Sequence, residues 1–386
     1  MITIQTNKTN LITALNKVTK IITSIGRMDT EKFGITLSFK GDKLHIIGLS
    51  ESRNVKIALE LISYTSDVEV STVSYSTDFK KLLEVLQTLS EENISLEFSE
   101  SSIVLRAKKT RITLPLSLKE LVEPSIEKKS MVEIRVQDMQ FALKNLLFSV
   151  SSDTARPILS SIKFIPLEQG GTLCVSTDGF RLSLVALPIT LPTEMGSLQI
   201  PAAFLRDCMT QVLLPSQKTV CAVTLEDMCG FEQAGISVFS KIIVGEYPPY
   251  ERVVFSQHAM SVSFSTSEMY DAIKTISILS RDYSNIIIFD VFESRLVVRP
   301  KKEVGGENES IVENVKVTGL VEEKITFAFN AKYILDFLST ITDDTATMRM
   351  NKSDSPTLFV PGSPETTVAS DSFTFRHIIM PVRISE

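Results

Sequence analysis

The sequence offers few side chains at a spacing that could perform covalent chemistry. Ser160 and Lys163 form an SxxK pair, the spacing at which a lysine can help to activate a serine nucleophile. The pair lies in a stretch that alternates apolar and polar residues and predicts a strand, whereas the catalytic motif begins a helix. Phosphate-binding glycine loops, HExxH and GxSxG motifs are absent from the sequence. A Ser–Lys hydrolase is therefore the last of the alternatives that we carry forward.

The histidines and cysteines do not form a recognisable metal or redox site either. Three histidines, His45, His258 and His377, stand far apart in the sequence. Four cysteines fall in the middle third, and their spacings match neither a CxxC redox pair nor a zinc site. We expect reduced, buried thiols, no metal, no cofactor and no catalytic residue.

The composition is typical of a soluble globular protein. Apolar residues make up 43% and charged residues 22% of the 386 positions, and no apolar run approaches the length of a membrane span. The first ten residues, MITIQTNKTN, lack the apolar segment of a signal peptide. We expect a cytoplasmic protein with no membrane partner. A net charge of −6 argues against indiscriminate coating of nucleic acid, but a local basic face stays compatible with it.

The elements that must position any site recur three times. A short strand followed by an amphipathic helix reads ITIQTNKTNLITALNKV from Ile2, VEIRVQDMQFALKNL from Val132 and VSFSTSEMYDAIKTI from Val262. Paired strands follow in each third, and a second helix comes next, as in STDFKKLLEVLQTL from Ser76. Each third closes with further alternating strands. The unit is therefore strand, helix, strands, helix, strands.

This repeat predicts three domains of similar size. Their expected ranges are 1–127, 128–256 and 257–386, each large enough for its own core. The glycine-bearing acidic insertion PKKEVGGENESIVEN from Pro300 predicts a loop.

The helices carry a modest excess of basic residues on their outward faces. In the first helix, Leu11, Leu15 and Val18 share one stripe, which leaves the cations on the opposite face. Side by side, such helices would form a surface suited to phosphates rather than to bases. The outward cations expected to face duplex DNA are Lys17, Lys20, Arg27, Lys80, Lys81, Lys144, Arg206 and Lys274, and Lys332 also occupies an outward position. No aromatic residues interleave them, so single-strand stacking is not predicted.

Four further segments give the sequence a family resemblance. SSDTARPILSSIKF from Ser151, STDGFRLSLVALPI from Ser176, GEYPPYERV from Gly245 and IIMPVRI from Ile378 resemble, in order and spacing, motifs of the bacterial DNA polymerase III beta subunit, the beta sliding clamp. The resemblance implies an α+β DNA clamp fold with three repeated domains, each with two helices packed on antiparallel sheets. It further implies a head-to-tail ring dimer that encircles duplex DNA independently of the DNA sequence. Such a dimer would catalyse no reaction.

The resemblance also implies two kinds of protein contact. A peptide-binding groove would receive the DNA polymerase catalytic subunit, the clamp loader and other clamp-binding repair proteins. Its residues would be Arg156, Leu159, Thr177, Gly179, Phe180, Arg181, Leu182, Pro248, Arg252, Val253, Met380, Pro381, Val382, Arg383 and Ile384. Ile278 and Leu279 match dimer-interface positions of the family, and Ile112 is their expected counterpart, with Lys108, Lys109 and Arg111 facing Glu303, Glu307 and Glu309.

Some positions depart from the family pattern. Phe180 replaces a polar or basic residue in the TDGxRL turn, and Pro249 replaces the common aspartate of the PxY segment. GRMDTEKFGITL from Gly26 lacks the proline-containing segment of the family, and Ser385 and Glu386 extend past its usual end. These differences predict an altered peptide preference or a second, divergent clamp. A repeat scaffold that binds proteins but not DNA is the other alternative.

Overall fold

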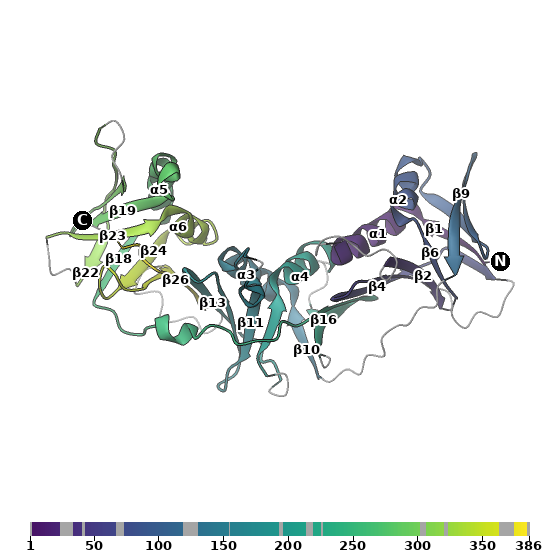
Figure 1. The fold of residues 1–386 in the computed structure, drawn as a ribbon, viewed down its shortest axis with the longest axis horizontal. Coiled ribbons are helices and arrows are strands. Elements are labelled where there is room, and N and C mark those ends of the chain that lie inside the picture. Colours follow the sequence, from purple (N-terminus) through teal and green to yellow (C-terminus); the bar gives the residue numbers. More distant parts are fainter. Residues whose placement is uncertain are drawn as a thin grey trace. The chain divides into compact units, whose positions relative to one another are not determined.

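The computed structural model describes residues 2–23, 34–40, 43–66, 73–118, 130–153, 155–192, 196–213, 219–224, 227–301, 306–319, 323–362 and 374–383 (Figure 1). The chain forms two compact units. One contains Met1–Met139 and Ala203–Ile242, and the other contains Gln140–Ala202 and Ile243–Glu386. The division therefore passes through the middle of the second sequence repeat, and each unit is described by itself.

The predicted order of elements occurs three times along the chain. The first repeat contains β1 (Ile2–Asn7), α1 (Lys8–Thr23), β2 (Gly34–Lys40), β3 (Lys43–Leu49), β4 (Arg53–Glu60), β5 (Ser63–Ser66), β6 (Val73–Thr77), α2 (Phe79–Thr88), β7 (Asn93–Phe98), β8 (Ser102–Ala107) and β9 (Thr110–Leu118). The second contains β10 (Ser130–Arg135), α3 (Val136–Leu146), η1 (Leu147–Ser149), η2 (Pro157–Ser160), β11 (Ser161–Pro166), β12 (Thr172–Thr177), β13 (Arg181–Leu187), β14 (Leu198–Pro201), α4 (Ala202–Asp207), η4 (Cys208–Val212), β15 (Thr219–Thr224), β16 (Met228–Gln233) and β17 (Ile236–Lys241).

The third repeat follows the short 3₁₀ helix η5 (Tyr250–Val253). It contains β18 (Met260–Ser265), α5 (Thr266–Ser280), η6 (Arg281–Tyr283), β19 (Ile286–Val291), β20 (Leu296–Pro300), β21 (Ser310–Val312), β22 (Lys316–Thr318), β23 (Ile325–Asn330), α6 (Ala331–Leu338), β24 (Thr345–Met350), β25 (Thr357–Pro361) and β26 (Thr374–Ile379). Strand β21 lies inside the insertion that was predicted to be a loop, so that prediction was wrong for Ser310–Val312. The backbone of β21 pairs antiparallel with β20, and the side chain of Val312 is buried.

Local sequence explains where the helices begin. Asp78 accepts a hydrogen bond from the Lys81 amide at the start of α2, and Asn330 accepts one from the Lys332 amide at the start of α6. In α1, Leu11, Leu15 and Val18 are at most 1% exposed, which confirms the predicted apolar stripe. The helices thus pack one face against the sheets and present the other to solvent.

Eight strands of every repeat form two four-stranded groups with one recurring order, and β5 and β22 are added at the outer edges, beside β1 and β18. The first group runs β6-β2-β3-β4, β14-β11-β12-β13 and β23-β19-β20-β21 in the three repeats. The second runs β1-β7-β8-β9, β10-β15-β16-β17 and β18-β24-β25-β26. The last strand of a first group is therefore β4, β13 or β21, and the last strand of a second group is β9, β17 or β26.

Neighbouring repeats join through these last strands. In the first joint, β4 pairs antiparallel with β17, so that Arg53 lies opposite Ser240. In the second joint, β13 pairs antiparallel with β26, so that Arg181 lies opposite Ile379. Both joints extend a sheet from one repeat into the next, and each joint lies within one compact unit.

Candidate functional site

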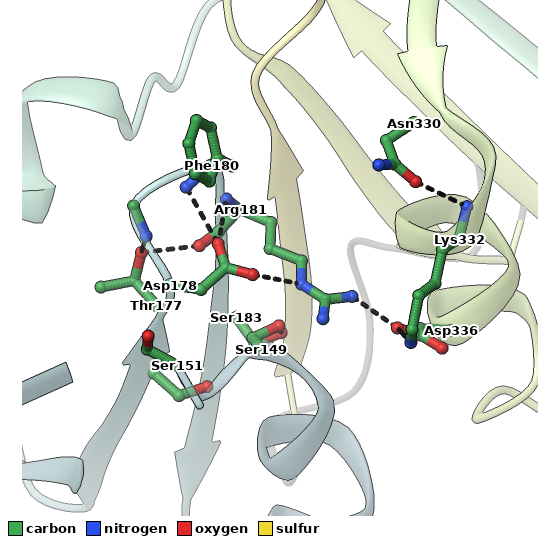
Figure 2. Close-up of polar contacts among 12 residues, drawn as sticks. Ser149, Ser151, Thr177, Asp178, Phe180, Arg181, Ser183, Asn330, Lys332 and Asp336 are labelled. Carbon is green, nitrogen blue, oxygen red and sulfur yellow. Dashed lines mark hydrogen bonds and ion pairs between the residues drawn. The ribbon is translucent and has the colours of Figure 1, made fainter. Parts of the chain in front are cut away.

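A tight turn between β12 and β13 is held by its own side chains. We call Thr177–Leu182 the partner turn. The Thr177 hydroxyl donates to the Arg181 carbonyl at 2.6 Å, and the amides of Phe180 and Arg181 donate to Asp178 Oδ1 at 2.9 and 3.0 Å (Figure 2). Gly179 has φ +95°, a conformation that favours glycine. These bonds hold Phe180 at the tip, where it is 60% exposed.

Arg181 connects the partner turn to helix α6 across the second joint. Its Nε donates to Asp178 Oδ2 at 2.9 Å, and its Nη1 donates to Asp336 Oδ2 at 2.6 Å (Figure 2). The guanidinium lies over the ring of Tyr333, 4.4 Å from its centroid. Since Arg181 is 7% exposed, this ion-paired arginine is part of the structure rather than a free surface charge.

The last described residues run past the partner turn. Strand β26 ends at Ile379, and the Met380 amide then donates to the Phe180 carbonyl at 2.9 Å. Two residues later, the Val382 amide donates to the Ala328 carbonyl at 2.8 Å. Strand β26 therefore stops before Met380, and the backbone of the residues after it is tied to the partner turn by a hydrogen bond.

An apolar cluster lies beside the partner turn on the continuous sheet of the second joint. Its buried members are Val175, Leu182, Leu184, Tyr247, Leu358, Val360 and Ile378, and Ile158, Tyr250 and Val253 pack against it. Tyr247 donates its hydroxyl to the Val175 carbonyl at 3.3 Å. Burial raises the pKa of Tyr247, and it raises the pKa of Tyr250 to about 12. Both phenols therefore stay neutral and contribute packing.

The remaining residues predicted for the groove differ in burial. Leu159 is buried at the end of η2, and Val253 is half-buried against the cluster. Arg156 is exposed, bonds Asp153 at 3.0 Å and lies beside Gly179. Pro248, Pro381 and Val382 are half-buried, Arg252, Met380 and Arg383 are exposed, and Ile384 lies outside the described residues.

Sequence reasoning missed several residues of this site. Asp336 and Tyr333 belong to α6, about 150 residues from the turn that they contact. Leu358 and Val360 on β25 are likewise distant in sequence. Tyr247 lies inside the quoted segment GEYPPYERV, so that motif was the available signal for it.

The helix faces carry the predicted cations at mixed exposure. Lys20, Lys80, Lys81, Lys144, Arg206 and Lys274 are exposed, and Arg27 lies outside the described residues. Lys17 differs from them because it is half-buried and its Nζ donates to the Val212 carbonyl at 2.8 Å, at the end of η4. Burial lowers the pKa of Lys17.

The residues predicted for a chain-to-chain contact lie on two elements. Ile112 is half-buried on β9, while on α5 Ile278 is 57% exposed and Leu279 is half-buried. Helix α5 packs against β21. Among the described strands, β21 pairs only with β20, and Thr110–Leu114 pairs only with β8.

The SxxK pair has no catalytic geometry. Ser160 closes the 3₁₀ helix η2 and donates to the Pro157 carbonyl at 2.6 Å. Lys163 lies on β11 with its ammonium over the ring of Tyr247, 5.5 Å from the centroid. Within the described ranges, no three His, Cys, Asp or Glu side chains gather into a metal site. No helix of the described chain is long and apolar enough to cross a membrane.

Comparison with solved structures places this fold among sliding clamps. The DNA polymerase sliding clamp of Bacillus subtilis superposes with a TM-score of 0.85 at 20% identity, covering 100% of both chains. The DNA polymerase III beta chain of Streptococcus pneumoniae superposes with a TM-score of 0.84 at 21% identity, again covering 100% of both chains. The repeated two-helix unit is therefore the clamp fold.

Sequence comparison identifies the family. The family models of the DNA polymerase III beta subunit match residues 133–249 with the central domain and residues 251–383 with the C-terminal domain. The beta sliding clamp of Streptococcus pneumoniae is 24% identical over 406 aligned positions, 99% of this chain and 100% of that one. That of Bacillus subtilis is 24% identical over 266, 67% of this chain and 66% of that one.

The chain belongs to the bacterial DNA polymerase III beta subunit family, the beta sliding clamps. It is a DNA sliding clamp, a non-catalytic processivity factor, so the predicted hydrolase and scaffold alternatives are not favoured.

Proposed function

We propose that two copies of this chain close a ring around duplex DNA by pairing β9 of each copy with β21 of the other. The recurring strand order carries this proposal. Two of the three kinds of joint, β4 with β17 and β13 with β26, form within the chain, and β9 and β21 are the remaining last strands. In this arrangement the domains are 1–127, 128–256 and 257–386, and six of them complete the ring.

The residues at the equivalent positions of the formed joints support Ile278 as a contact of the third. Counted from Ala272 in α5 and from Ala142 in α3, Ile278 corresponds to Phe148. The Phe148 ring packs against the ring of His377 across the second joint, with 5.1 Å between the two ring centroids. An exposed isoleucine at the matching place is thus suited to cover a neighbouring strand.

Ile112 and Leu279 fit the same scheme. Strands β9 and β17 both follow a two-residue hairpin turn, and Ile112 is the third residue of β9 just as Val238 is the third residue of β17. Val238 is fully buried and lies opposite Val55 in the first joint. Leu279 corresponds to Ile21 of α1, which is 0% exposed at the first joint. Half-buried in one chain, both residues would become buried in the dimer. Lys108, Lys109 and Arg111 would add rim contacts with the acidic 303–309 segment, which are individually weak.

Sedimentation of a double variant tests this joint. Ile278→Ala with Leu279→Asp removes apolar area and places a charge in the contact, so the variant should be monomeric and should not be retained on closed circular DNA after loading. Ile62→Asp, at a 55% exposed isoleucine outside the proposed joint, is the matched control and should stay dimeric. A dimer that persists in the double variant would refute the joint.

We also propose that the helix faces contact DNA phosphates and that the partner turn with its apolar cluster binds peptides. Each phosphate contact would be weak and additive, and Arg27, whose place after the first helix matches a DNA-contacting arginine of the family, would be the most important single one. The peptide would place apolar anchors on the cluster, with Arg156, Arg252 and Arg383 at the rim. The polymerase, the clamp loader and repair proteins would compete for this site in the cytoplasm.

Truncation tests the peptide site separately from the ring. Deleting Met380 through Glu386 removes the segment tied to Phe180, and it should abolish calorimetric binding of a polymerase-derived clamp-binding peptide while the dimer persists. Deleting only Ser385 and Glu386 is the control and should leave the affinity unchanged. Undiminished affinity in the longer truncation would place the partner site elsewhere.

A further inference from the structure

One carboxylate oxygen of helix α6 is shared by two cations from different surfaces. Asp336 Oδ2 accepts from Arg181 Nη1 at 2.6 Å and from Lys332 Nζ at 2.6 Å (Figure 2). The Lys332 side chain is 63% exposed, whereas the Arg181 side chain is 7% exposed. Asp336 therefore joins an exposed cation of the helix face to the buried arginine of the partner turn.

We propose that Asp336 couples the two surfaces, so that a phosphate bound by Lys332 tightens peptide binding at the partner turn. The inference rests on the proposed function, in which DNA lies along the helix faces and peptides bind at the turn. It adds a regulatory link that neither site has by itself.

The competition for one oxygen supplies the mechanism. A carboxylate oxygen that is divided between two cations holds each less firmly than it holds one alone. Lys332 carries a compact charge on a flexible stem, so its ammonium can turn to a phosphate without moving the helix. When Lys332 binds a phosphate, Arg181 becomes the only one of the two cations that still pairs with Asp336.

A firmer Arg181 stabilises the partner turn itself. Its amide donates to Asp178 Oδ1, its carbonyl accepts from Thr177, and its Nε donates to Asp178 Oδ2. Arg181 thus fixes the backbone that presents Phe180 and hydrogen-bonds Met380. A turn held in one conformation loses less conformational freedom when a peptide binds, and the affinity rises accordingly.

The first joint has the corresponding arginine and aspartate, but its second cation, Arg206, comes from a different position of the helix than Lys332. Arg53 contacts Asp207 Oδ2 at 3.3 Å, and Arg206 contacts the other oxygen, Oδ1, at 3.2 Å. Each cation there has its own oxygen. The shared oxygen therefore belongs to the joint that carries the proposed peptide site.

Fluorescence anisotropy of a labelled polymerase-derived clamp-binding peptide, with and without a duplex oligonucleotide at low salt, measures the coupling. In the unmodified protein the duplex should tighten peptide binding about two- to fivefold, the range that one partly exposed ion pair supplies. The peptide should tighten duplex binding by the same factor, because coupling between two sites is reciprocal.

Three variants isolate the route. Lys332→Met should bind the peptide about two- to fivefold more tightly without DNA, and the duplex should add nothing further. Lys332→Arg keeps the cation and should retain the coupling. Lys274→Met, which removes a lysine that lies over Tyr270 on α5, should leave the coupling intact and controls for the loss of one helix-face charge.

The outcomes separate this inference from the proposed function. If the peptide or the duplex fails to bind the unmodified protein, the proposed function fails. If both bind but neither alters the other, or if the duplex still tightens peptide binding in Lys332→Met, only the Asp336 link is overturned. Asp336→Asn should weaken peptide binding and remove the coupling, and a retained coupling in that variant would equally contradict the link.

Discussion

The two joints within the chain contain the same types of residue at matching positions, but these residues differ in burial and in their further contacts. Arg53 and Arg181 both begin the strand that enters the joint, and they pair with Asp207 and Asp336, which lie at matching places on α4 and α6. In the first joint the pair is fully buried, at 1% and 0% exposure, and Arg53 also donates to the Ile21 carbonyl. In the second, Asp336 is 21% exposed.

The outer faces of the joints differ more than the ion pairs do. One and three residues after the arginine, the first joint has Asn54 and Lys56, whereas the second has Leu182 and Leu184. The leucines of the second joint belong to the apolar cluster beside the partner turn. An arginine–aspartate pair is therefore common to both joints, whereas the apolar side chains on the opposite face of the strand distinguish the second joint.

The largest expected effect comes from breaking the buried pair of the first joint. Arg53→Met leaves Asp207 buried with only Arg206 as a charged partner, and it should lower the free energy of unfolding by about 3 to 5 kcal/mol. Arg181→Met should cost less, about 1 to 3 kcal/mol, because Asp336 keeps Lys332 and reaches solvent. Urea unfolding of both variants measures the difference, and equal losses would remove the distinction between the joints.

The next largest effect is expected on peptide affinity, when residues on the outer faces of the two joints are exchanged. Leu184→Lys gives the second joint the residue of the first, and it should weaken the clamp-binding peptide about tenfold to a hundredfold, as expected for loss of a buried anchor. Leu184→Gln tests the same contact without a buried charge. The reciprocal Lys56→Leu is the control and should leave peptide binding unchanged. Unaltered affinity in both Leu184 variants, with native near-UV circular dichroism, would exclude the apolar cluster as the site.

A titratable residue distinguishes the joints at low pH. His377 of the second joint corresponds to Val238 of the first, is fully buried, and shares a hydrogen bond of 2.9 Å with the Ser183 hydroxyl. Burial, with the nearby charge of Arg181, lowers the pKa of His377 from 6.5 to about 3. Between these values the unfolded chain binds a proton that the native chain does not, so stability falls as the pH drops from 6.5 toward 3.

Replacing this histidine should reduce the acid sensitivity of the protein. From pH 6.5 to pH 5, His377→Val should lose about 1 to 2 kcal/mol less unfolding free energy than the unmodified protein. His258→Asn, at an exposed histidine, should change the pH dependence less. Parallel pH profiles for the His377→Val variant and the unmodified protein would show that the pKa of His377 is the same in the native and unfolded states, which would contradict the lowered pKa.

The repeat was predictable from the sequence because it depends on apolar spacings between residues that are close together in the chain. Apolar spacing predicted the α-helices α1 to α6 of the described residues, and the offsets of Ala14, Ala142 and Ala272 predicted the register of the first helix in each repeat. The ion pairs were not predictable in this way, since Asp207 and Asp336 look like ordinary surface acids of amphipathic helices. Their partners are set by strand pairing over more than 150 residues. The same holds for β21, whose three residues are too few for a periodic signal.

The smallest expected effect separates two lysines of α1, the helix that packs against η4 near the first joint. Lys20 is exposed, whereas Lys17 donates to the Val212 carbonyl, so its ammonium is already engaged by the end of a helix. If phosphates lie along this face, Lys20→Met should lower the slope of log affinity against log salt by about 0.9, the value for one phosphate contact. Lys17→Met should change the slope by less, but it should lower the unfolding free energy by about 1 kcal/mol because the Val212 carbonyl loses its donor. Filter binding of duplex DNA across a salt series gives the slopes, and urea unfolding gives the stabilities. The reverse ranking of the two slopes would mean that Lys17 leaves Val212 to bind DNA, and that the contact between α1 and η4 is not a fixed part of the first joint.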